Sequence, residues 1–395
     1  MILHVACLPF PSHQGTQAAI AAMLEASVAS GRRSELLVYA RSGYAVDTSY
    51  AVHRVPDFPK VRSLRSGPSW GKVVLDARCV FEIRRLAKRQ RPDAIVAHHI
   101  EATLAALVAQ VAPVHYVAHT ALEHELPLYF PFLPDRLVAE VGARAERLVC
   151  RASAGVGAVA PSLARMLDGI ATYLPVPWLP EDLEALSRET CRRALGICGD
   201  ARICLYAGNL DRYQGWQRLI EALAVLRRSQ PDARLLIATE SDAAPARAEA
   251  ARYGVADAID VRRLDGESAR RLVHAASDLA WVPRLSPGGL PIKMLDAFAR
   301  GLPVVAMARA TADLPVGNAC VQVANDDPIA LAEGAQRVFA SGAEVFRQEA
   351  RRYLVERHSV AAFDGALARL LGEAPARRHR GMSTFAPTRA FLDPK

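Results

Sequence analysis

An alternation of short apolar runs with helical stretches is the feature that most constrains how this chain folds. The first apolar run, residues 2–8 (ILHVACL), leads to Gly15-Thr16-Gln17, which opens a helical stretch that ends at Gly31. Further apolar runs follow at residues 35–40, 93–99, 114–119 and 155–161, with helical stretches between most of them. Runs that are apolar throughout are typical of strands buried on both faces. Strands that alternate with helices predict a doubly wound parallel sheet.

Three prolines, Pro175, Pro177 and Pro180, interrupt this pattern, which then starts again. New apolar runs at residues 203–210, 233–240, 258–264 and 278–283 alternate with further helical stretches. A chain of 395 residues is also too long for a single hydrophobic core. We therefore expect an α/β fold of two Rossmann-like domains, residues 1–177 and 178–358, whose sheets face a central cleft. Residues 359–395 predict a C-terminal helix and a tail that return to the first domain.

The composition is that of a globular protein and excludes several other classes. With 51% hydrophobic residues, 23% charged residues and a mean hydropathy of +0.08, neither a disordered nor a collagen-like chain is indicated. No apolar run reaches the ~18 residues that a membrane span requires, and no basic region precedes the first run, as it would in a signal peptide. The seven cysteines are odd in number and form no C-x-x-C pair, so we expect a reducing, cytoplasmic location.

The positive charge is concentrated in one segment. The 49 basic and 41 acidic residues give a net charge of +8, and residues 60–91 alone carry ten basic residues against Asp76 and Glu82, which is also +8. The rest of the chain is therefore neutral. The ten basic residues of this segment are Lys60, Arg62, Arg65, Lys72, Arg78, Arg84, Arg85, Lys88, Arg89 and Arg91.

Residues 69–90 of the basic segment predict an amphipathic helix. A basic amphipathic helix is a candidate for binding an anionic membrane surface, and a solvated helix face is the alternative. Nucleic acid is disfavoured as a partner because no binding motif accompanies the charge and aromatic residues make up only 6% of the chain. The apolar residues that we expect on or near one side of this helix are Val73, Ala77, Val80, Phe81 and Leu86.

Five loops follow predicted strands and could therefore bind a ligand, since open α/β sheets bind ligands beyond the carboxyl ends of their strands. These loops are residues 11–17, 98–101, 119–129, 208–215 and 286–293. In the last of them, Gly288-Gly289 stands before a helix that we expect to begin near Pro291. Backbone amides at a helix N-terminus attract anions, and Lys293 adds a charge in the first turn. Asp296 could accept hydrogen bonds from a ribose diol; the alternative is a plain turn with a glycine-rich entry.

Residues 286–306 (SPGGLPIKMLDAFARGLPVVA) resemble the nucleotide-sugar signature of the retaining GT-B glycosyltransferases of family 4 (glycosyl transferases group 1), E-G-x-P-x-K-x-L-E-A-x-A-x-G-x-P-V-V. Asp296 stands where the second glutamate of that signature grips the ribose, and Gly288 stands where the first glutamate contacts the transferred sugar. The resemblance implies donor-binding roles for Gly288, Gly289, Leu290, Lys293 and Asp296. The matching residues are Gly289, Pro291, Lys293, Leu295, Ala297, Ala299, Gly301, Pro303, Val304 and Val305.

Residues 206–223 (YAGNLDRYQGWQRLIEAL) are similar to a second segment of the family, G-R-L-x-x-x-K-G-x-x-x-L-I-x-A. Asn209 replaces its arginine and Gln214 replaces its lysine, the two side chains that neutralise the donor diphosphate, while Gly215 is kept. Arg212 could supply a missing charge; the alternative is a solvated loop residue.

Near the N-terminus, Gly15-Thr16-Gln17 resembles the family's glycine loop, which approaches the donor phosphates and the acceptor. A glycine permits such a close approach of the backbone, although many turns between a strand and a helix contain one. By this resemblance Gly15 contacts the donor, and Thr16 and Gln17 lie on the acceptor side.

Histidines and glutamates follow two strands of the first half. One group is His98, His99 and Glu101, and the other begins at His119 and includes Glu123, His124 and Glu125. Neither group has the H-E-x-x-H spacing of a zinc site, so we expect no metal. The family resemblance implies that His119 lies near the reacting sugar as a catalytic residue and that His98 and Glu101 line the acceptor side. A buried structural histidine is the alternative.

The resemblance implies a metal-independent glycosyltransferase without a cofactor, which moves a sugar with retention from a UDP- or GDP-linked donor to a hydroxyl acceptor. The first domain would take the acceptor, with a lipid-linked acceptor as one option, and the second would bind the nucleotide sugar. A location in the cytoplasm, peripheral at the inner face of the membrane, would suit such an acceptor. The alternatives are an inactive or weak binding protein of the same fold and a nucleotide-sugar epimerase.

Overall fold

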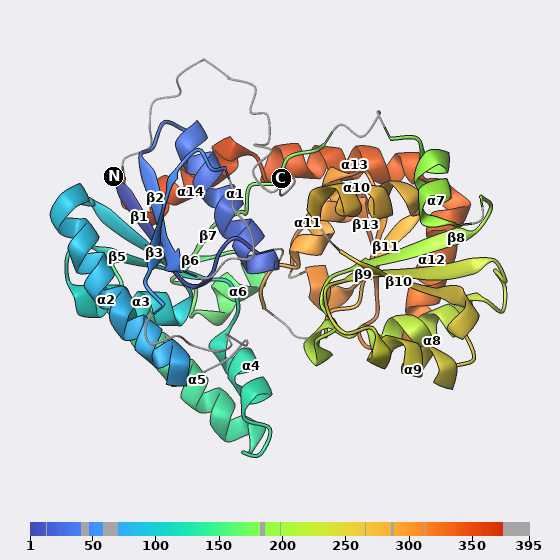
Figure 1. Ribbon diagram of the computed structural model, residues 1–395, viewed down its shortest axis with the longest axis horizontal. Helices are drawn as coiled ribbons and strands as arrows, with labels where there is room; N and C mark the ends of the chain where they lie inside the picture. The colour runs from blue at the N-terminus through green and yellow to red at the C-terminus, as the bar shows by residue number, and fades with distance from the viewer. Residues whose placement is uncertain are drawn as a thin grey trace. The chain divides into compact units, whose positions relative to one another are not determined.

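The computed structural model describes residues 1–12, 14–40, 47–57, 70–181, 186–197, 199–264, 266–285, 288–311 and 313–373. These residues form two compact units, shown in Figure 1. The first unit contains residues 1–177, 288–290 and 360–373, and the second contains residues 178–285 and 291–359. Each unit is a parallel sheet with helices on both faces, so the predicted class, α/β with two Rossmann-like domains, is confirmed.

The first sheet has seven strands in the order β3-β2-β1-β4-β5-β6-β7, and every strand pair is parallel. Strand β1 lies inside the sheet, between β2 and β4, and its first five residues are buried. The strands are β1 (Ile2–Pro9), β2 (Ser34–Tyr39), β3 (Ala51–Val55), β4 (Ala94–His98), β5 (Val114–Ala118), β6 (Gly155–Ala158) and β7 (Thr172–Tyr173).

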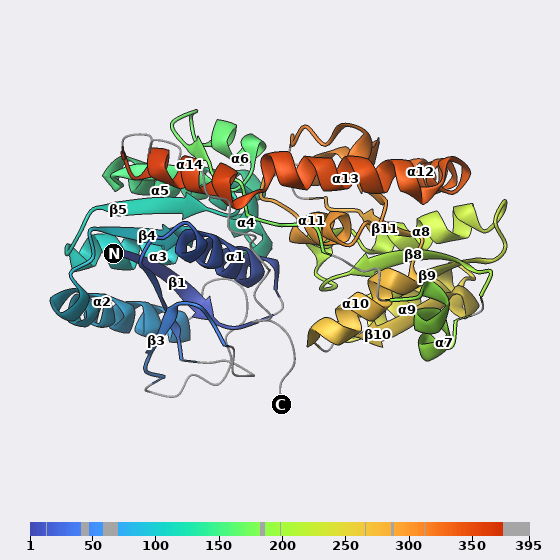
Figure 2. The same ribbon diagram turned by 90° about the horizontal axis from the view of Figure 1, so that it is seen from above.

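Helices cover both faces of the first sheet (Figure 2). On one face, Leu75 and Ile83 of α2 pack with Ala102 of α3 against Leu3 and Ile95 of the sheet. Helix α1, which begins at Gly15 as predicted, lies on the opposite face together with α14. The helices are α1 (Gly15–Ala29), α2 (Trp70–Gln90), α3 (His99–Ala109), α4 (Leu122–Glu125), the 3-10 helix η1 (Leu126–Tyr129), α5 (Asp135–Ala152), α6 (Pro161–Met166) and α14 (Val360–Leu370).

Helix α14 follows the whole second unit in sequence and packs on β6 and β7 of the first. Phe363 and Leu367 of α14 are completely buried. Arg32, just beyond α1, holds the same segment from outside: its Nε lies 2.6 Å from Asp364 Oδ1 and its Nη1 lies 2.8 Å from Glu373 Oε2. Residues 374–395, in which the predicted tail lies, are outside the described residues.

The second sheet has six parallel strands in the order β10-β9-β8-β11-β12-β13. Its core centres on Trp281 and Tyr206, which are both completely buried among apolar residues of α8 and α12. The strands are β8 (Arg202–Ala207), β9 (Ala233–Thr239), β10 (Ile259–Arg263), β11 (Leu279–Val282), β12 (Val304–Met307) and β13 (Cys320–Val323).

Most helices of the second unit lie between these strands in sequence, whereas α7 precedes β8, and α12 and α13 follow β13 (Figure 1). They are α7 (Arg188–Leu195), η2 (Arg212–Gln214), α8 (Gln217–Leu226), α9 (Ala244–Arg252), η3 (Ala256–Ala258), α10 (Gly266–Ala276), α11 (Ile292–Ala299), η4 (Ala308–Thr311), η5 (Gly317–Ala319), α12 (Pro328–Ser341) and α13 (Ala343–Arg357). None of the helices in the described part of the chain is long and apolar enough to cross a membrane.

The predicted basic helix is present as α2, but the expectation for its apolar side is wrong in part. Leu75, Cys79 and Ile83 face the sheet together with Leu86, whereas Val73 is 56% exposed and Phe81 is 67% exposed. Of the five expected residues the helix therefore buries only Leu86 fully, and it presents three, Val73, Ala77 and Phe81, to solvent. Residues 60–69 of the basic segment lie outside the described residues.

Candidate functional site

Lys293 is the centre of a polar cluster at the carboxyl ends of two neighbouring strands, β8 and β11, in the second unit. The residue lies in the first turn of α11, where the sequence predicts it. Its Nζ donates hydrogen bonds to Gln214 Oε1 at 2.7 Å and to Tyr206 Oη at 3.1 Å. The same Nζ is 4.3 Å from the centroid of the Tyr206 ring, which adds a cation–π contact. Two predicted donor-binding residues, Gln214 and Lys293, are thus in direct contact.

The two loops that carry this cluster are fixed to each other by their backbones. Leu285 N donates a hydrogen bond to Tyr213 O at 3.1 Å. Gly215 has φ +69°, and a Cβ on it would lie 2.2 Å from the carbonyl oxygen of Pro283. Only glycine permits this approach, so the glycine kept from the family pattern joins the loop after β8 to the loop after β11.

Arg284 is a second buried cation of this cluster, and sequence reasoning missed it. Its side chain is 8% exposed, and its guanidinium carbon lies 6.0 Å from the centroid of the Tyr213 ring. Burial, and after it the charge of Arg284, lower the pKa of Lys293 to about 7, whereas Asp211 acts in the opposite direction. A signal was available in the sequence, because Arg284 follows β11 at the edge of the sheet where ligands bind.

Asn209 and Arg212 are the other predicted donor-binding residues of this loop, and the structure describes the side chain of Asn209 only. The backbone oxygen of Asn209 accepts a hydrogen bond from Tyr206 Oη, so Asn209 joins the cluster through its main chain. Its side-chain Oδ1 is buried and has no hydrogen-bond partner among the described residues. Arg212 begins η2, and its side chain lies outside the described residues.

Asp296 lies in a buried network of ion pairs. Its Oδ1 accepts a hydrogen bond from Arg300, and its Oδ2 accepts one from Arg270 at 3.1 Å. Asp296 is 3% exposed, and Arg300 also pairs with Glu267 and with Glu181. Both carboxylate oxygens of the predicted ribose contact are therefore bound to arginines of its own unit.

The glycine pair before α11 has a left-handed backbone. Gly288 has φ +73° and Gly289 has φ +76°, and both are buried together with Leu290. A glutamate at position 288 would be strained in this conformation, so glycine suits the backbone where the family signature has its first glutamate. Residues 286 and 287 of this loop lie outside the described residues.

In the first unit, the predicted glycine loop forms the start of α1. Gly15 is exposed and Thr16 is partly exposed, whereas Gln17 is buried. Gln17 Nε2 lies 3.4 Å from the carbonyl oxygen of Pro9 and 3.4 Å from Gln14 Oε1, so its amide ties α1 to the end of β1.

His119 and His98 lie together at the carboxyl ends of β5 and β4. His98 Nδ1 and His119 Nε2 are 3.0 Å apart, and both side chains are buried. The ring of His99 stacks on that of His119 with centroids 4.8 Å apart. Burial lowers the pKa of both His98 and His119 well below the usual range, and neighbouring histidines act in the same direction. Glu101 lies in the first turn of α3, one turn from His98.

The described residues contain no group of three or more histidine, cysteine, aspartate or glutamate side chains arranged to hold a metal ion. At the histidine cluster, the ring nitrogens form hydrogen bonds with each other instead of converging on one point.

Comparison with known proteins finds a family match within the second unit. Residues 201–341 match the family model of the glycosyl transferases group 1. The matched range contains β8, β11 and α11, and therefore the whole Lys293 cluster. The resemblance to the glycosyl transferases group 1 is thus confirmed, and no curated protein matches the chain.

Solved structures of GT-B glycosyltransferases share the fold of the two units. A sucrose-phosphate synthase from Thermosynechococcus elongatus aligns with a TM-score of 0.75 at 18% identity, over 94% of this chain and 98% of that chain. HepE from Anabaena, solved with UDP and glucose, aligns with a TM-score of 0.71 at 15% identity, over 94% and 99%. WaaG, a glycosyltransferase involved in lipopolysaccharide biosynthesis, gives 0.67 at 17% identity, over 94% and 100%.

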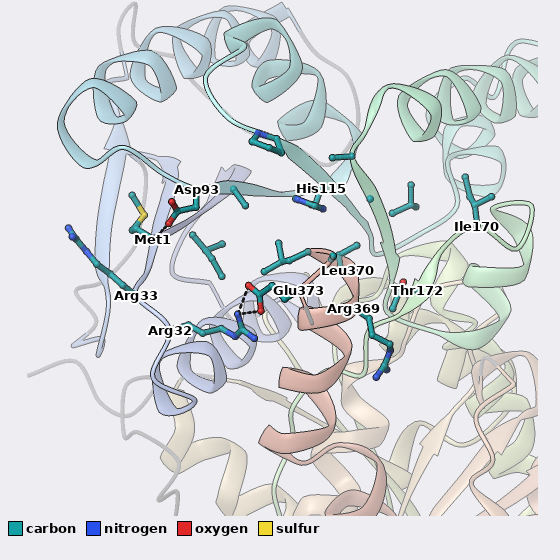
Figure 3. A pocket seen from close by; sticks show the side chains of 18 residues that line it. Met1, Arg32, Arg33, Asp93, His115, Ile170, Thr172, Arg369, Leu370 and Glu373 are labelled. Carbon is teal, nitrogen blue, oxygen red and sulfur yellow. Dashed lines mark hydrogen bonds and ion pairs between the residues drawn. The ribbon is translucent and has the colours of Figure 1, made fainter. Parts of the chain in front are cut away.

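A cavity of about 650 Å³ in the first unit lies at the opposite edge of its sheet (Figure 3). It is lined by residues at the starts of β1, β4 and β6 and by the end of α14, among them Ile2, Ala94, Gly155 and Leu370. In Figure 3, Leu370 and His115 lie beside it, and Arg32 pairs with Glu373 at its margin. None of the predicted site residues lines this cavity, so it is distinct from the two clusters described above.

Proposed function

We propose that the chain transfers a sugar, with retention, from a nucleoside-diphosphate sugar to a hydroxyl acceptor. The Lys293 cluster carries the donor part of this proposal. Lys293 and Arg284 place two cations at the carboxyl ends of β8 and β11, within the domain that matches the glycosyltransferase family. Lys293, which the family signature shares, and Arg284 would bind the diphosphate, and Arg284 would compensate in part for the two cations that Asn209 and Gln214 replace. HepE binds UDP and UDP-glucose, which supports a donor of this class.

The proposed reaction needs neither a metal ion nor a cofactor. The bond between the anomeric carbon and the diphosphate oxygen breaks, and the acceptor oxygen forms its bond to that carbon on the same face. The departing diphosphate takes the proton of the acceptor hydroxyl, and Lys293 and Arg284 stabilise the charge that develops on it. The structure offers no pair of carboxylates among the predicted site residues that would favour a double displacement, so we assign no protein nucleophile.

Turnover and nucleotide binding test this proposal. The protein is incubated with a panel of UDP- and GDP-sugars and a membrane extract, and melting temperature and free nucleotide are followed, with and without a chelator. We expect a thermal shift with one nucleotide and chelator-insensitive release of it, both lost in Lys293→Met and kept in the control variant Arg351→Met of α13. No shift with any nucleotide would refute the donor assignment. Inversion at the anomeric carbon of the product would refute retention.

A binding protein without transferase activity is the second candidate, and Gly288 favours it. Residue 288 is a glycine with a left-handed backbone, so it has no side chain at the position where the family signature has the glutamate that contacts the sugar. Nucleotide binding that Lys293→Met abolishes, without release of nucleotide in any acceptor extract, would support this candidate over the transferase.

We propose further that α2 docks on an anionic membrane and so brings the protein to a lipid-linked acceptor. The helix carries six basic and two acidic residues, which gives +4. Val73 and Phe81 of this helix are exposed, and Leu137, Val141 and Leu148 are exposed on α5 of the same unit. Exposed apolar residues that alternate with cations are typical of helices that lie in a membrane interface. Each basic residue near such a surface contributes about 1 kcal/mol.

Vesicle sedimentation tests the membrane proposal. Arg84 is left unchanged because its guanidinium donates to the carbonyl oxygens of Val108 and Ala109 at the end of α3. We expect the triple variant Arg85→Gln, Lys88→Gln, Arg89→Gln to lose most of its binding to vesicles with anionic lipid. Arg347→Gln, Arg351→Gln, Arg352→Gln on α13 removes the same charge from the second unit and should bind as before. Equal loss in both variants would show that only net charge matters.

A further inference from the structure

Three histidines from adjacent strands form a diagonal row on one face of the first sheet. In the register of the sheet, His4 of β1 pairs with Val96 and Ala6 pairs with His98, while His98 pairs with Val117 of β5. Alternate residues of a strand point to the same face. His4, His98 and His119 therefore share a face, each displaced by two residues from the last. Leu3 and Ile95, on the other face, pack with α2 and α3.

Two hydrogen bonds join the three rings, and both use the same pair of ring nitrogens. His4 Nδ1 lies 3.1 Å from His98 Nε2, and His98 Nδ1 lies 3.0 Å from His119 Nε2. Each link thus joins the Nδ1 of one ring to the Nε2 of the next. The exposed fractions of the three side chains are 1%, 0% and 5%. Nδ1 of His119 is the ring nitrogen at the outer end of the row that takes no part in these links.

The three rings are neutral. Burial lowers the pKa of His4 to about 3 and holds the pKa values of His98 and His119 well below the usual range. A neutral imidazole has one nitrogen that donates and one that accepts. Because the links repeat with the same polarity, all three rings must carry their proton on the same nitrogen: all on Nδ1 or all on Nε2.

The inner end of the row selects between these two arrangements. His4 Nε2 is buried and has no hydrogen-bond partner among the described residues. If every ring carried its proton on Nε2, this nitrogen would be a buried N–H without an acceptor. With the protons on Nδ1, it is a buried acceptor without a donor, which proteins tolerate more often than an orphaned N–H.

We propose that His4 and His98 are positioning residues that hold His119 as a neutral imidazole with its proton on Nδ1. His119 then presents a hydrogen-bond donor at its outer end, and its other nitrogen accepts the bond from His98. Such a ring can bind a substrate hydroxyl or oxyanion but has no nitrogen available to accept a proton. This inference rests on the proposed function for the part that His119 plays toward a sugar, and it assigns proton removal to the departing diphosphate.

The ring of His99 packs against the face of the His119 ring and so restricts its orientation. Its backbone has φ +68°, a left-handed conformation that few residues other than glycine adopt. This conformation begins α3 and leaves the His99 ring stacked on that of His119, with 26° between the ring planes. A strained residue at the edge of the sheet where ligands bind is typical of a functional site.

Nitrogen NMR of the protein without substrate tests the proposal. In 15N-histidine-labelled protein above pH 7.5, long-range proton–nitrogen spectra show which ring nitrogen carries the proton. We expect His4, His98 and His119 to be protonated at Nδ1 and bare at Nε2. The opposite tautomer at any of the three, or a mixture, would overturn the proposal. Since no substrate is present, this result does not depend on whether the protein transfers a sugar.

A pair of variants tests whether the row controls His119. His98→Ala leaves a polar space in which water can donate or accept, so we expect the nitrogen signals of His119 to move to the averaged position of two exchanging tautomers. His115→Ala removes another buried histidine of β5 and should leave them unchanged. Circular dichroism checks that both variants fold. Unchanged His119 signals in a folded His98→Ala protein would show that His98 does not set the tautomer.

Discussion

Lys293 has a charge that depends on its surroundings. Its ammonium is buried next to a second cation, and these two effects bring its pKa to about 7. A bound diphosphate would favour the charged form and raise this pKa. Binding of a nucleotide and uptake of a proton are therefore linked at this residue.

We predict that the affinity for UDP or GDP, whichever binds, falls as the pH rises above 7. The protonated form of Lys293 binds the anion, and above its pKa the protonated fraction falls about tenfold for each pH unit. Lys293→Arg keeps the charge at every pH and should bind with a flat profile between about pH 7.5 and 9, where the terminal phosphate is already fully ionised. Titration calorimetry measures both proteins. The same slope in Lys293→Arg would show that another group causes the dependence.

Asp296 contributes to stability through its two arginines. We predict that Asp296→Asn lowers the free energy of unfolding by about 3 kcal/mol, because it leaves buried guanidinium groups with one carboxylate fewer. Glu344→Gln, which breaks the exposed pair with Arg347, should change it little. Urea denaturation of the two variants checks this difference. An unchanged stability of Asp296→Asn together with weaker nucleotide binding would instead support the ribose contact.

The site was predictable from sequence where spacing along the chain determines position. The sequence places Lys293 in the first turn of α11 and Gln214 in the loop after β8. The two side chains come into contact because β8 and β11 are neighbouring strands whose carboxyl ends lie at the same edge of the sheet. Tyr206 and Arg284 were missed because neither belongs to a motif; their roles depend on side-chain direction. Asp296 was predicted to contact a ribose; in the structure it pairs with Arg300, four residues further along, and with Arg270 of α10, which no local pattern connects to it.

At the scale of elements, the end of α14 packs closely against the first sheet at Gly155. A Cβ at position 155 would lie 2.6 Å from the carbonyl oxygen of Leu370 and 2.8 Å from His115 Nδ1. Both neighbours are held in place, one as backbone and one as a buried ring. The end of α14 can therefore lie on β6 only while residue 155 has no side chain.

We predict that Gly155→Ala destabilises the protein by about 1–3 kcal/mol, since α14 must move away from the sheet. Gly365→Ala is the matched control: it lies within α14, its Cβ would meet only Arg369 Nη1 at 3.8 Å, and alanine favours a helix by about 0.5–1 kcal/mol over glycine. Thermal denaturation should lower the melting temperature of the first variant and raise that of the second. Shifts of the same sign would contradict this account of Gly155.

Most elements followed from apolar periodicity, and those that did not have identifiable reasons. The strands β3 and β13 were not predicted because they are short and not continuously apolar: AVHRV lies near the edge of its sheet and CVQV contains a glutamine. Strand β7 has only two residues. In α2, sequence alone could not separate buried from exposed apolar residues, because valines and phenylalanine occur on more than one side.

At the scale of the whole molecule, several buried histidines make stability depend on pH. His4, His98, His119 and His274 all have lowered pKa values in the folded protein, with burial as the main cause. In the unfolded chain each histidine titrates near pH 6.5. Their stabilising contribution is present above that pH and is lost as the pH falls toward the folded pKa values.

We predict a steep loss of stability between pH 6.5 and 5, of up to roughly 1.4 kcal/mol per pH unit for each of these histidines. Asp76 and Glu146 have raised pKa values because of burial, so they take up protons in the folded state and offset part of the loss at the acidic end. Unfolding free energies from urea titrations at each pH check the slope. A stability that stays constant from pH 7 to 5 would contradict this prediction.

The order of the units along the chain has a consequence for synthesis on the ribosome. The second unit is almost one uninterrupted stretch, whereas the first contains both the beginning of the chain and helix α14. A nascent chain that has emerged to residue 359 can thus complete its second unit while β6 and β7 of the first still lack their covering helix. The first unit is therefore the first to emerge but the last to complete its fold. A chain that stops shortly before α14 would release a folded second unit joined to an open sheet, which is the kind of surface that chaperones and proteases recognise.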